Sequence, residues 1–187
     1  MRGSEKNRKN KRNDQGYSLL ELIVVIAILA ILSAGVLYSF STITGYRAKQ
    51  AAEVISQALS ETKVDAMSKD FAYMEIYKDG DVYKLKRNGS GQEEVLGNKS
   101  VTIRYDTGSG LQLLGGAKGT NQSLCITYEK GTGAFRPLLD ASKTNETTKT
   151  LETLKPERYC KEIVITAGSR TKKLVLLRDT GKCEYDG

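Results

Sequence analysis

The chain of 187 residues has no histidine and no tryptophan, and it contains only 2 prolines and 3 cysteines. The absence of histidine removes the usual general base, the commonest zinc ligand and the base of Ser-His and Cys-His catalytic pairs. No serine or cysteine stands in a recognisable nucleophile elbow, and Gly115-Gly116 lacks the Lys-Ser or Lys-Thr pair of a phosphate-binding loop. We therefore expect no enzymatic activity, no metal site and no cofactor.

The excess of positive charge is small outside the N-terminus. The formal net charge is +7, from 29 Lys and Arg against 22 Asp and Glu. Residues 1–16 hold six of the basic and two of the acidic side chains, which leaves 23 basic and 20 acidic ones in the rest of the chain. That remainder is an ordinary surface balance, so net charge alone does not predict a nucleic-acid-binding protein.

A long apolar segment follows the basic leader. Eleven apolar residues stand without interruption at Leu22–Leu32, and Glu21 is the one side chain charged at neutral pH among the 24 residues 17–40. As a helix, this segment would extend about 36 Å, enough to cross a hydrocarbon core of about 30 Å. We therefore predict a membrane-spanning helix over residues 17–40. A buried core helix and a secretory signal peptide are the alternatives, but no small-residue cleavage site directly follows the run.

The junction between the leader and the apolar run is the most informative stretch. It reads Gln-Gly-Tyr-Ser-Leu-Leu-Glu-Leu at residues 15–22, so that a charged leader ends in Gly16 and a glutamate follows shortly after an aromatic residue. Over GYSLLELIVVIAILAILSAG, the chain resembles the processing and assembly motif of type IV prepilins, the precursors of pilins, minor pilins and pseudopilins. The resemblance implies that a prepilin peptidase cleaves between Gly16 and Tyr17 and methylates the new N-terminus at Tyr17. Tyrosine stands here where phenylalanine is usual in that family.

The same resemblance implies a structural subunit with defined partners. These are other pilin subunits of a homo- or hetero-oligomeric filament, the prepilin peptidase, an inner-membrane assembly platform and membrane lipid. The positive-inside rule keeps the leader in the cytoplasm, so we expect a single-pass protein of the cell membrane with its head outside. The subunit would then enter a pilus or pseudopilus at the cell surface, used for adhesion, motility, protein secretion or DNA uptake. We favour a minor pilin or pseudopilin, and the choice among these systems stays open.

Glu21 places a charged carboxylate within the apolar segment. A carboxylate in hydrocarbon costs about 3 kcal/mol unless it finds a partner. No lysine, arginine or histidine lies between Tyr17 and Tyr46. The nearest cation is the amino group that cleavage would create at Tyr17, which predicts that Glu21 pairs with that amine on a neighbouring subunit during assembly. The alternative is a glutamate that extends to the membrane surface.

Beyond the apolar run, the pattern predicts an α+β head. Apolar residues continue at helical spacing to Ala66, which predicts one helix over residues 18–69, packed on an antiparallel β-sheet. Three hairpins are expected, the first at Asp79-Gly80. Residues 140–156 show no apolar period and read as a solvated loop. The predicted strands are 73–77, 82–86, 100–105, 123–129, 134–138, 162–166, 173–178 and 182–185. The predicted organisation is a leader (1–16), an assembly helix (17–40), its amphipathic continuation (41–70) and a β-rich head (71–187).

The three cysteines, Cys125, Cys160 and Cys183, lack the C-x-x-C spacing of metal and redox sites. Outside the membrane, one disulfide and one free thiol is a reasonable arrangement. A Cys160–Cys183 bond would hold the C-terminus, as in many pilins, whereas a Cys125–Cys160 bond would close the loop between them. Three buried free thiols are the third alternative.

A basic turn provides a second functional hypothesis. Arg170, Lys172 and Lys173 follow Gly168-Ser169 in the last predicted hairpin. DNA-uptake minor pilins carry basic residues in similar C-terminal loops, so the resemblance implies a tip subunit that binds DNA or another ligand there. An ordinary solvated hairpin is the competing interpretation, and the small charge excess of the chain after residue 16 favours it.

Overall fold

The computed structural model describes residues 18–88 and 93–186, with the backbone alone described at residues 34–44. It divides into two compact units, residues 1–39 and 40–187. Helix α1 (Leu19–Ser68) agrees with the predicted helix to within one residue at each end. The strands are β1 (Met74–Asp79), β2 (Val82–Arg87), β3 (Glu93–Gly97), β4 (Val101–Asp106), β5 (Leu111–Leu113), β6 (Leu124–Ile126), β7 (Glu162–Ala167), β8 (Arg170–Leu177) and β9 (Lys182–Asp186).

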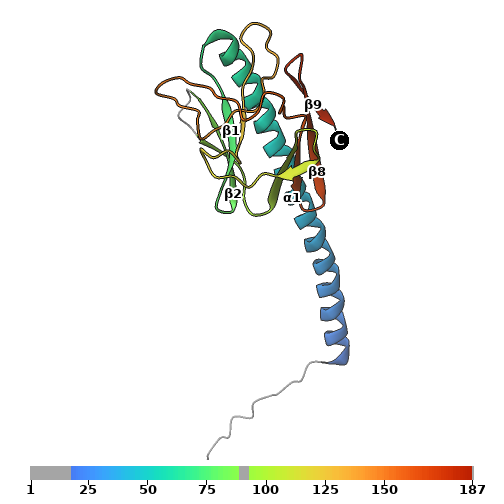
Figure 1. Ribbon diagram of the computed structural model, residues 1–187. Helices are drawn as coiled ribbons and strands as arrows, with labels where there is room; N and C mark the ends of the chain where they lie inside the picture. Colours follow the sequence, from blue (N-terminus) through green and yellow to red (C-terminus); the bar gives the residue numbers. More distant parts are fainter. Residues whose placement is uncertain (1–17, 89–92, 187) are drawn as a thin grey trace, which may run out of the picture. The chain divides into compact units, whose positions relative to one another are not determined.

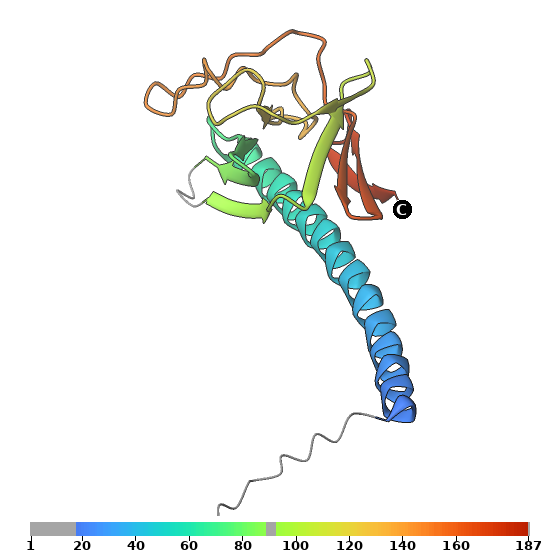
Figure 2. The same ribbon diagram turned by 90° about the horizontal axis from the view of Figure 1, so that it is seen from below.

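The strands form two antiparallel sheets instead of the single predicted sheet (Figures 1 and 2). The first has the order β3-β2-β1-β6 and the second β5-β4-β7-β8-β9. The chain passes from one sheet to the other between β3 and β4. At this passage a side chain at Gly97 would overlap Val101, so glycine permits the close approach of the two strands. The α+β class is thus confirmed, and the prediction of one sheet is wrong.

One stripe of α1 packs against the inner faces of both sheets, which lie on different sides of the helix in Figure 2. The stripe is rich in alanine, and small side chains let the strands approach the helix closely. Its members follow the 3.6-residue period of a helix, as the sequence predicted. The buried residues of the helix are Ala48, Ala51, Ala52, Ile55, Ala58, Leu59, Thr62 and Ala66.

Two predicted hairpins are present with short turns. β1 and β2 pair up to Asp79↔Val82, and Gly80 takes a φ of 60° in the turn between them. β7 and β8 pair up to Ala167↔Arg170, so the second turn consists of Gly168 and Ser169 alone. Arg170 therefore belongs to a strand and not to the turn in which the sequence placed it.

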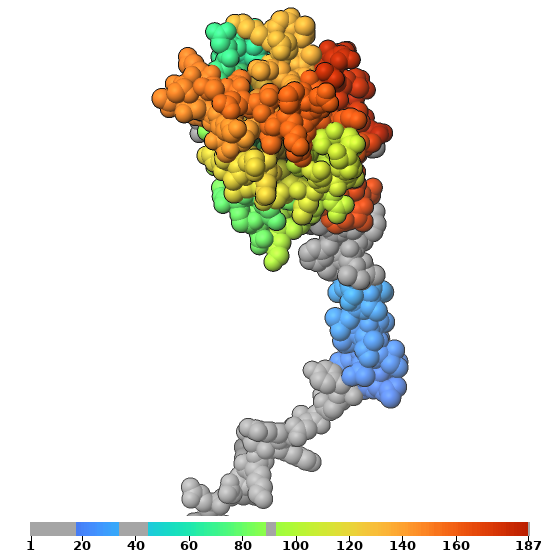
Figure 3. All heavy atoms as spheres, viewed as in Figure 1, coloured from blue at the N-terminus to red at the C-terminus, as the bar shows by residue number. Residues whose placement is uncertain are grey.

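The prediction of the middle hairpin is largely wrong. β6 has three residues, and the predicted strand at 134–138 is replaced by the isolated bridges Tyr128↔Phe135 and Cys125↔Leu139. The long connection that follows covers one face of the head, where residues 140–160 appear in orange in Figure 3. It is less solvated than predicted, because Asp140 and Ala141 are buried.

Candidate functional site

The first turn of α1 begins with a capped helix end. The hydroxyl of Ser18 accepts a hydrogen bond from the backbone N–H of Glu21 at 3.2 Å. A serine in this position satisfies one of the unpaired N–H groups at the start of a helix. The Ser-x-x-Glu spacing of a capping box was present in the sequence and could have predicted this cap. Gly16 and Tyr17, the predicted cleavage site, lie outside the described residues.

Apart from Glu21, the helix residues 19–32 are apolar, and they are exposed on all sides. Their large side chains have exposed fractions between 48% at Val24 and 80% at Leu19. Glu21 forms no ion pair with any residue in the described ranges. The exposed set comprises Leu19, Leu20, Leu22, Ile23, Val24, Val25, Ile26, Ile28, Leu29, Ile31 and Leu32. Within residues 18–33, this side-chain surface is therefore available to lipid or to other protein chains.

The cations of the predicted basic turn lie on different faces of the second sheet. Arg170 and Lys172 pair with Ala167 and Ile165, whose side chains belong to the core. Lys173 alternates with them and therefore points to the opposite face. A Cβ atom at Gly45 would lie 2.7 Å from Cγ of Arg170, which places the arginine side chain against α1.

Lys173 is neutralised where it lies. Its ammonium group is 2.8 Å from a carboxylate oxygen of Glu162 and 3.6 Å from one of Asp186. The hydrogen bond to Glu162 and the charge of that residue raise the pKa of Lys173. The structure therefore does not gather Arg170, Lys172 and Lys173 into one patch.

All three cysteines are free thiols in this structure, so it contains neither the Cys160–Cys183 nor the Cys125–Cys160 disulfide that the sequence left open. β8 separates Cys160 from Cys183. Cys183 pairs with Leu176 of β8, while the N–H of Leu176 donates on its other side to the carbonyl of Lys161 at 2.8 Å. Residues on the two strands beside a third lie about 9.5 Å apart, beyond the Cα separation of about 7 Å that a disulfide tolerates. Burial raises the pKa of each of the three thiols.

Comparison with known proteins bears on the N-terminal segment. The family described as "Prokaryotic N-terminal methylation motif" matches residues 11–37. The match covers the leader end, the predicted cleavage site, Glu21 and all of the apolar run Leu22–Leu32. The chain carries the signature of type IV prepilins. This motif is typical of structural subunits of surface filaments and not of enzymes.

No curated protein and no solved structure matches the chain. Among the residues that the structure describes, no helix offers an apolar stretch long enough to span a membrane. Of the predicted span, Tyr17 lies outside those residues, and residues 34–40 are described by their backbone alone.

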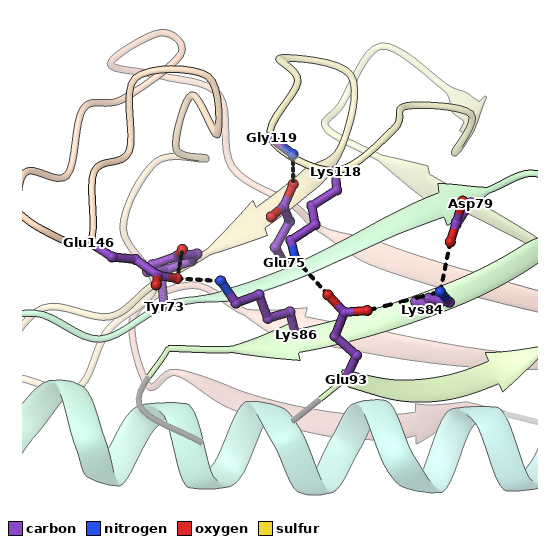
Figure 4. Close-up of polar contacts among 9 residues, drawn as sticks. All are labelled: Tyr73, Glu75, Asp79, Lys84, Lys86, Glu93, Lys118, Gly119 and Glu146. Atoms are coloured by element: carbon purple, nitrogen blue, oxygen red, sulfur yellow. Dashed lines mark hydrogen bonds and ion pairs between the residues drawn. The ribbon is translucent and has the colours of Figure 1, made fainter. Parts of the chain in front are cut away.

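The head contains polar contacts that the sequence did not predict (Figure 4). Glu75 of β1 is buried, with 3% of its surface exposed. Its carboxylate accepts hydrogen bonds from the hydroxyl of Ser123 at 2.6 Å and from the N–H of Gly119 at 2.7 Å. These contacts attach the loop before β6 to the outer face of the first sheet.

A separate group of contacts attaches the long connection after β6. Glu146 accepts hydrogen bonds from Lys86 at 2.5 Å and from the hydroxyl of Tyr73 at 2.8 Å. The bond from Lys86, and then the bond from Tyr73, holds the pKa of Glu146 below its usual value. In the same way, Lys118 and then Tyr77 lower the pKa of Glu93. Hydrogen bonds of glutamate carboxylates thus attach the loop before β6 and the connection after β6 to the first sheet.

Proposed function

We propose that the chain is a minor pilin or pseudopilin that is cleaved by prepilin peptidase and assembles through α1 into a pilus or pseudopilus. The observation that carries this proposal is the methylation motif at residues 11–37. Because the motif covers the segment that is processed and packed in filaments, it supports processing and assembly more directly than any property of the head.

The exposed apolar surface of residues 19–32 supports the same proposal. Covering such a surface contributes about 25 cal/mol per Å² of apolar area, which makes lipid or neighbouring helices favourable surroundings. We infer that residues 17–40 lie in the membrane before assembly, with the leader in the cytoplasm and the head outside. In the filament, the same surface would pack against the corresponding helices of other subunits.

N-terminal mass analysis of the protein extracted from membranes tests the proposal. We expect a mature chain that begins with N-methylated Tyr17, because glycine before the bond lets the backbone enter the peptidase without a side-chain clash. Gly16→Leu should block cleavage, and Gly3→Leu, a matched change within the leader, should not. A wild-type chain that still begins at Met1, or is cut beyond residue 40, would contradict the proposal.

A tip subunit that binds DNA through Arg170, Lys172 and Lys173 is the alternative. Its support is the presence of three cations on one strand. The pairing of Lys173 with Glu162 and Asp186 reduces the charge that it can offer to a phosphate backbone. We therefore rank this function below filament assembly.

A further inference from the structure

Two adjoining depressions lie where β5 faces the turn at residues 155–158. Their volumes are about 350 Å³ and 390 Å³, within the range of small-molecule sites, and both are lined by Gln112 and Arg158. The rest of the first depression is lined by hydroxyl and charged groups. Most of the rest of the second is lined by amides and two leucines. The additional lining residues are Thr107, Ser109, Lys155 and Glu157 in the first, and Tyr105, Leu113, Gly115, Asn121, Gln122 and Leu154 in the second.

Arg158 stands between the two depressions without a counter-ion among the described residues. Its Nη2 donates to Oε1 of Gln112 at 3.0 Å, and this neutral acceptor is its one side-chain partner in the described part of the chain. A guanidinium group has five N–H donors in a planar fork that matches a carboxylate. A half-buried arginine with most of its donors unused therefore favours an anionic ligand.

The two depressions together form one groove. Its walls are held in place by hydrogen bonds. A carboxylate oxygen of Asp106 accepts from the N–H groups of Gly108 at 2.7 Å and Gly110 at 2.9 Å, which closes the turn that carries Thr107 and Ser109. Opposite it, the N–H of Arg158 donates to the carbonyl of Lys155 at 3.2 Å. The groove is thus built before any ligand enters, which lowers the entropic cost of binding.

The buried carboxylate of Glu75 positions the third wall. By binding Gly119 and Ser123, it fixes the two ends of the segment that presents Asn121 and Gln122 to the groove. Amide side chains donate and accept hydrogen bonds at once, as the hydroxyl groups of a sugar do. The hydrogen bonds of Glu75 on the first sheet thus also shape this groove.

We propose that the groove binds a saccharide that carries a carboxylate. Arg158 would bind the carboxylate, with Lys155 offsetting the negative charge of Glu157 in the same lining. The amides of Gln112, Asn121 and Gln122 would bind the hydroxyls. The sole aromatic residue of the lining, Tyr105, is 7% exposed, so it offers no face on which a nucleotide base could stack. This proposal concerns the head alone and does not depend on filament assembly.

Titration of the full chain, purified in a detergent without a sugar headgroup, tests it. Glucuronate should bind saturably with a Kd on the order of 1 mM or tighter, and glucose about tenfold more weakly because it lacks the charged group. Arg158→Gln should abolish the difference between the two sugars. Arg136→Gln, which changes another half-buried arginine outside the groove, should preserve it.

A second measurement keeps the test decisive if Arg158→Gln does not fold. In nuclear magnetic resonance spectra of the wild-type chain, glucuronate should shift the side-chain amide signals of Gln112, Asn121 and Gln122. Absence of saturable binding, equal affinity for glucose and glucuronate, or tighter binding of adenosine monophosphate than of glucuronate would overturn the proposal. Glucuronate binding that shifts none of these three amides would also overturn it.

Discussion

The side-chain hydroxyl of Ser18 accepts a hydrogen bond from the backbone N–H of Glu21 at 3.2 Å, at the first turn of α1. The contact uses the backbone of Glu21 and leaves its carboxylate uncommitted. A substitution of Ser18 therefore removes the helix cap alone, and a substitution of the Glu21 side chain removes the charge alone. Removal of a serine cap costs about 1 kcal/mol, whereas removal of the charge affects whatever cation the carboxylate meets in the assembled filament.

Glu21→Gln is expected to give a processed subunit that does not assemble. The change keeps the shape and the cap, and membrane insertion becomes no worse because a charge is removed. Cleavage at Gly16-Tyr17 should survive. Docking should fail because the amine of Tyr17 on the neighbouring subunit would lose its counter-ion in surroundings of low dielectric constant. The measurement is the incorporation of the variant into sheared filaments, scored beside its processing.

Ser18→Ala is the matched control for this experiment. It weakens the cap but keeps the carboxylate, so we expect it to be incorporated. Normal incorporation of processed Glu21→Gln would rule out pairing with the amine and leave the prepilin motif intact, since a glutamate that only extends to the membrane surface could be exchanged with little effect.

Local signals account for the parts of the fold that the sequence predicted correctly. The Asp79-Gly80 turn sits between two alternating strands, and glycine supplies the positive φ that the turn adopts. The alanine stripe of α1 repeats with the helical period over many turns. β3 and β5 were missed because they are short edge strands with few buried residues, and their position depends on neighbours distant in sequence.

The head sites were harder to predict because they depend on pairing register. Arg170 and Lys173 look like one cluster in sequence, but the turn has two residues, so strand alternation separates them. Glu75 lies between the apolar residues Met74 and Ile76, and nothing in the sequence indicates that Ser123 will contact it. Such contacts join residues far apart in the chain, which local periodicity cannot describe.

The free thiols predict a defined order of chemical labelling. Burial raises the pKa of all three cysteines, so few thiolates exist at pH 8, and only the thiolate reacts with iodoacetamide. Cys183 should be labelled first and slowly, because Cys125 and Cys160 are 0% and 6% exposed. Mass analysis of the labelled native chain measures this, and Cys183→Ser should leave almost no native labelling.

Labelling in denaturant without a reductant provides the contrasting measurement. Three modified cysteines would agree with the structure. Two protected cysteines would instead establish a disulfide, and peptide mapping would show whether it joins Cys160 to Cys183 in spite of the strand between them.

The glutamates that tie the loops to the first sheet predict a loss of stability in acid. The pKa values of Glu93 and Glu146 are lowered from the ordinary value of 4.5, so their contribution is complete above that pH. It is lost as the pH falls through the lowered values, because the protonated groups lose their ion pairs with Lys118 and Lys86. Urea unfolding midpoints of the full chain should therefore decline below about pH 4.5, by a small amount because both carboxylates are partly exposed.

The double variant Glu93→Gln/Glu146→Gln should be less stable than the wild type at neutral pH and show a shallower decline in acid. Glu157→Gln, at an exposed position in a loop, serves as the control and should follow the wild-type curve. A double variant with the same acid decline as the wild type would show that other carboxylates cause it.

The ion pairs of Lys173 predict that the head binds DNA only weakly. At physiological salt, we expect the purified chain to bind duplex DNA no more tightly than about 1 μM, the upper end of non-specific affinity. Lys173→Gln should leave that affinity and its salt dependence unchanged, because Glu162 and Asp186 already neutralise the ammonium group. If the hairpin did contact phosphates, the substitution would weaken binding and reduce the salt slope by about 0.9. Lys99→Gln, an exposed lysine in the β3–β4 connection, would then have no such effect, so the pair of variants distinguishes a DNA-binding strand from an ordinary ion-paired one.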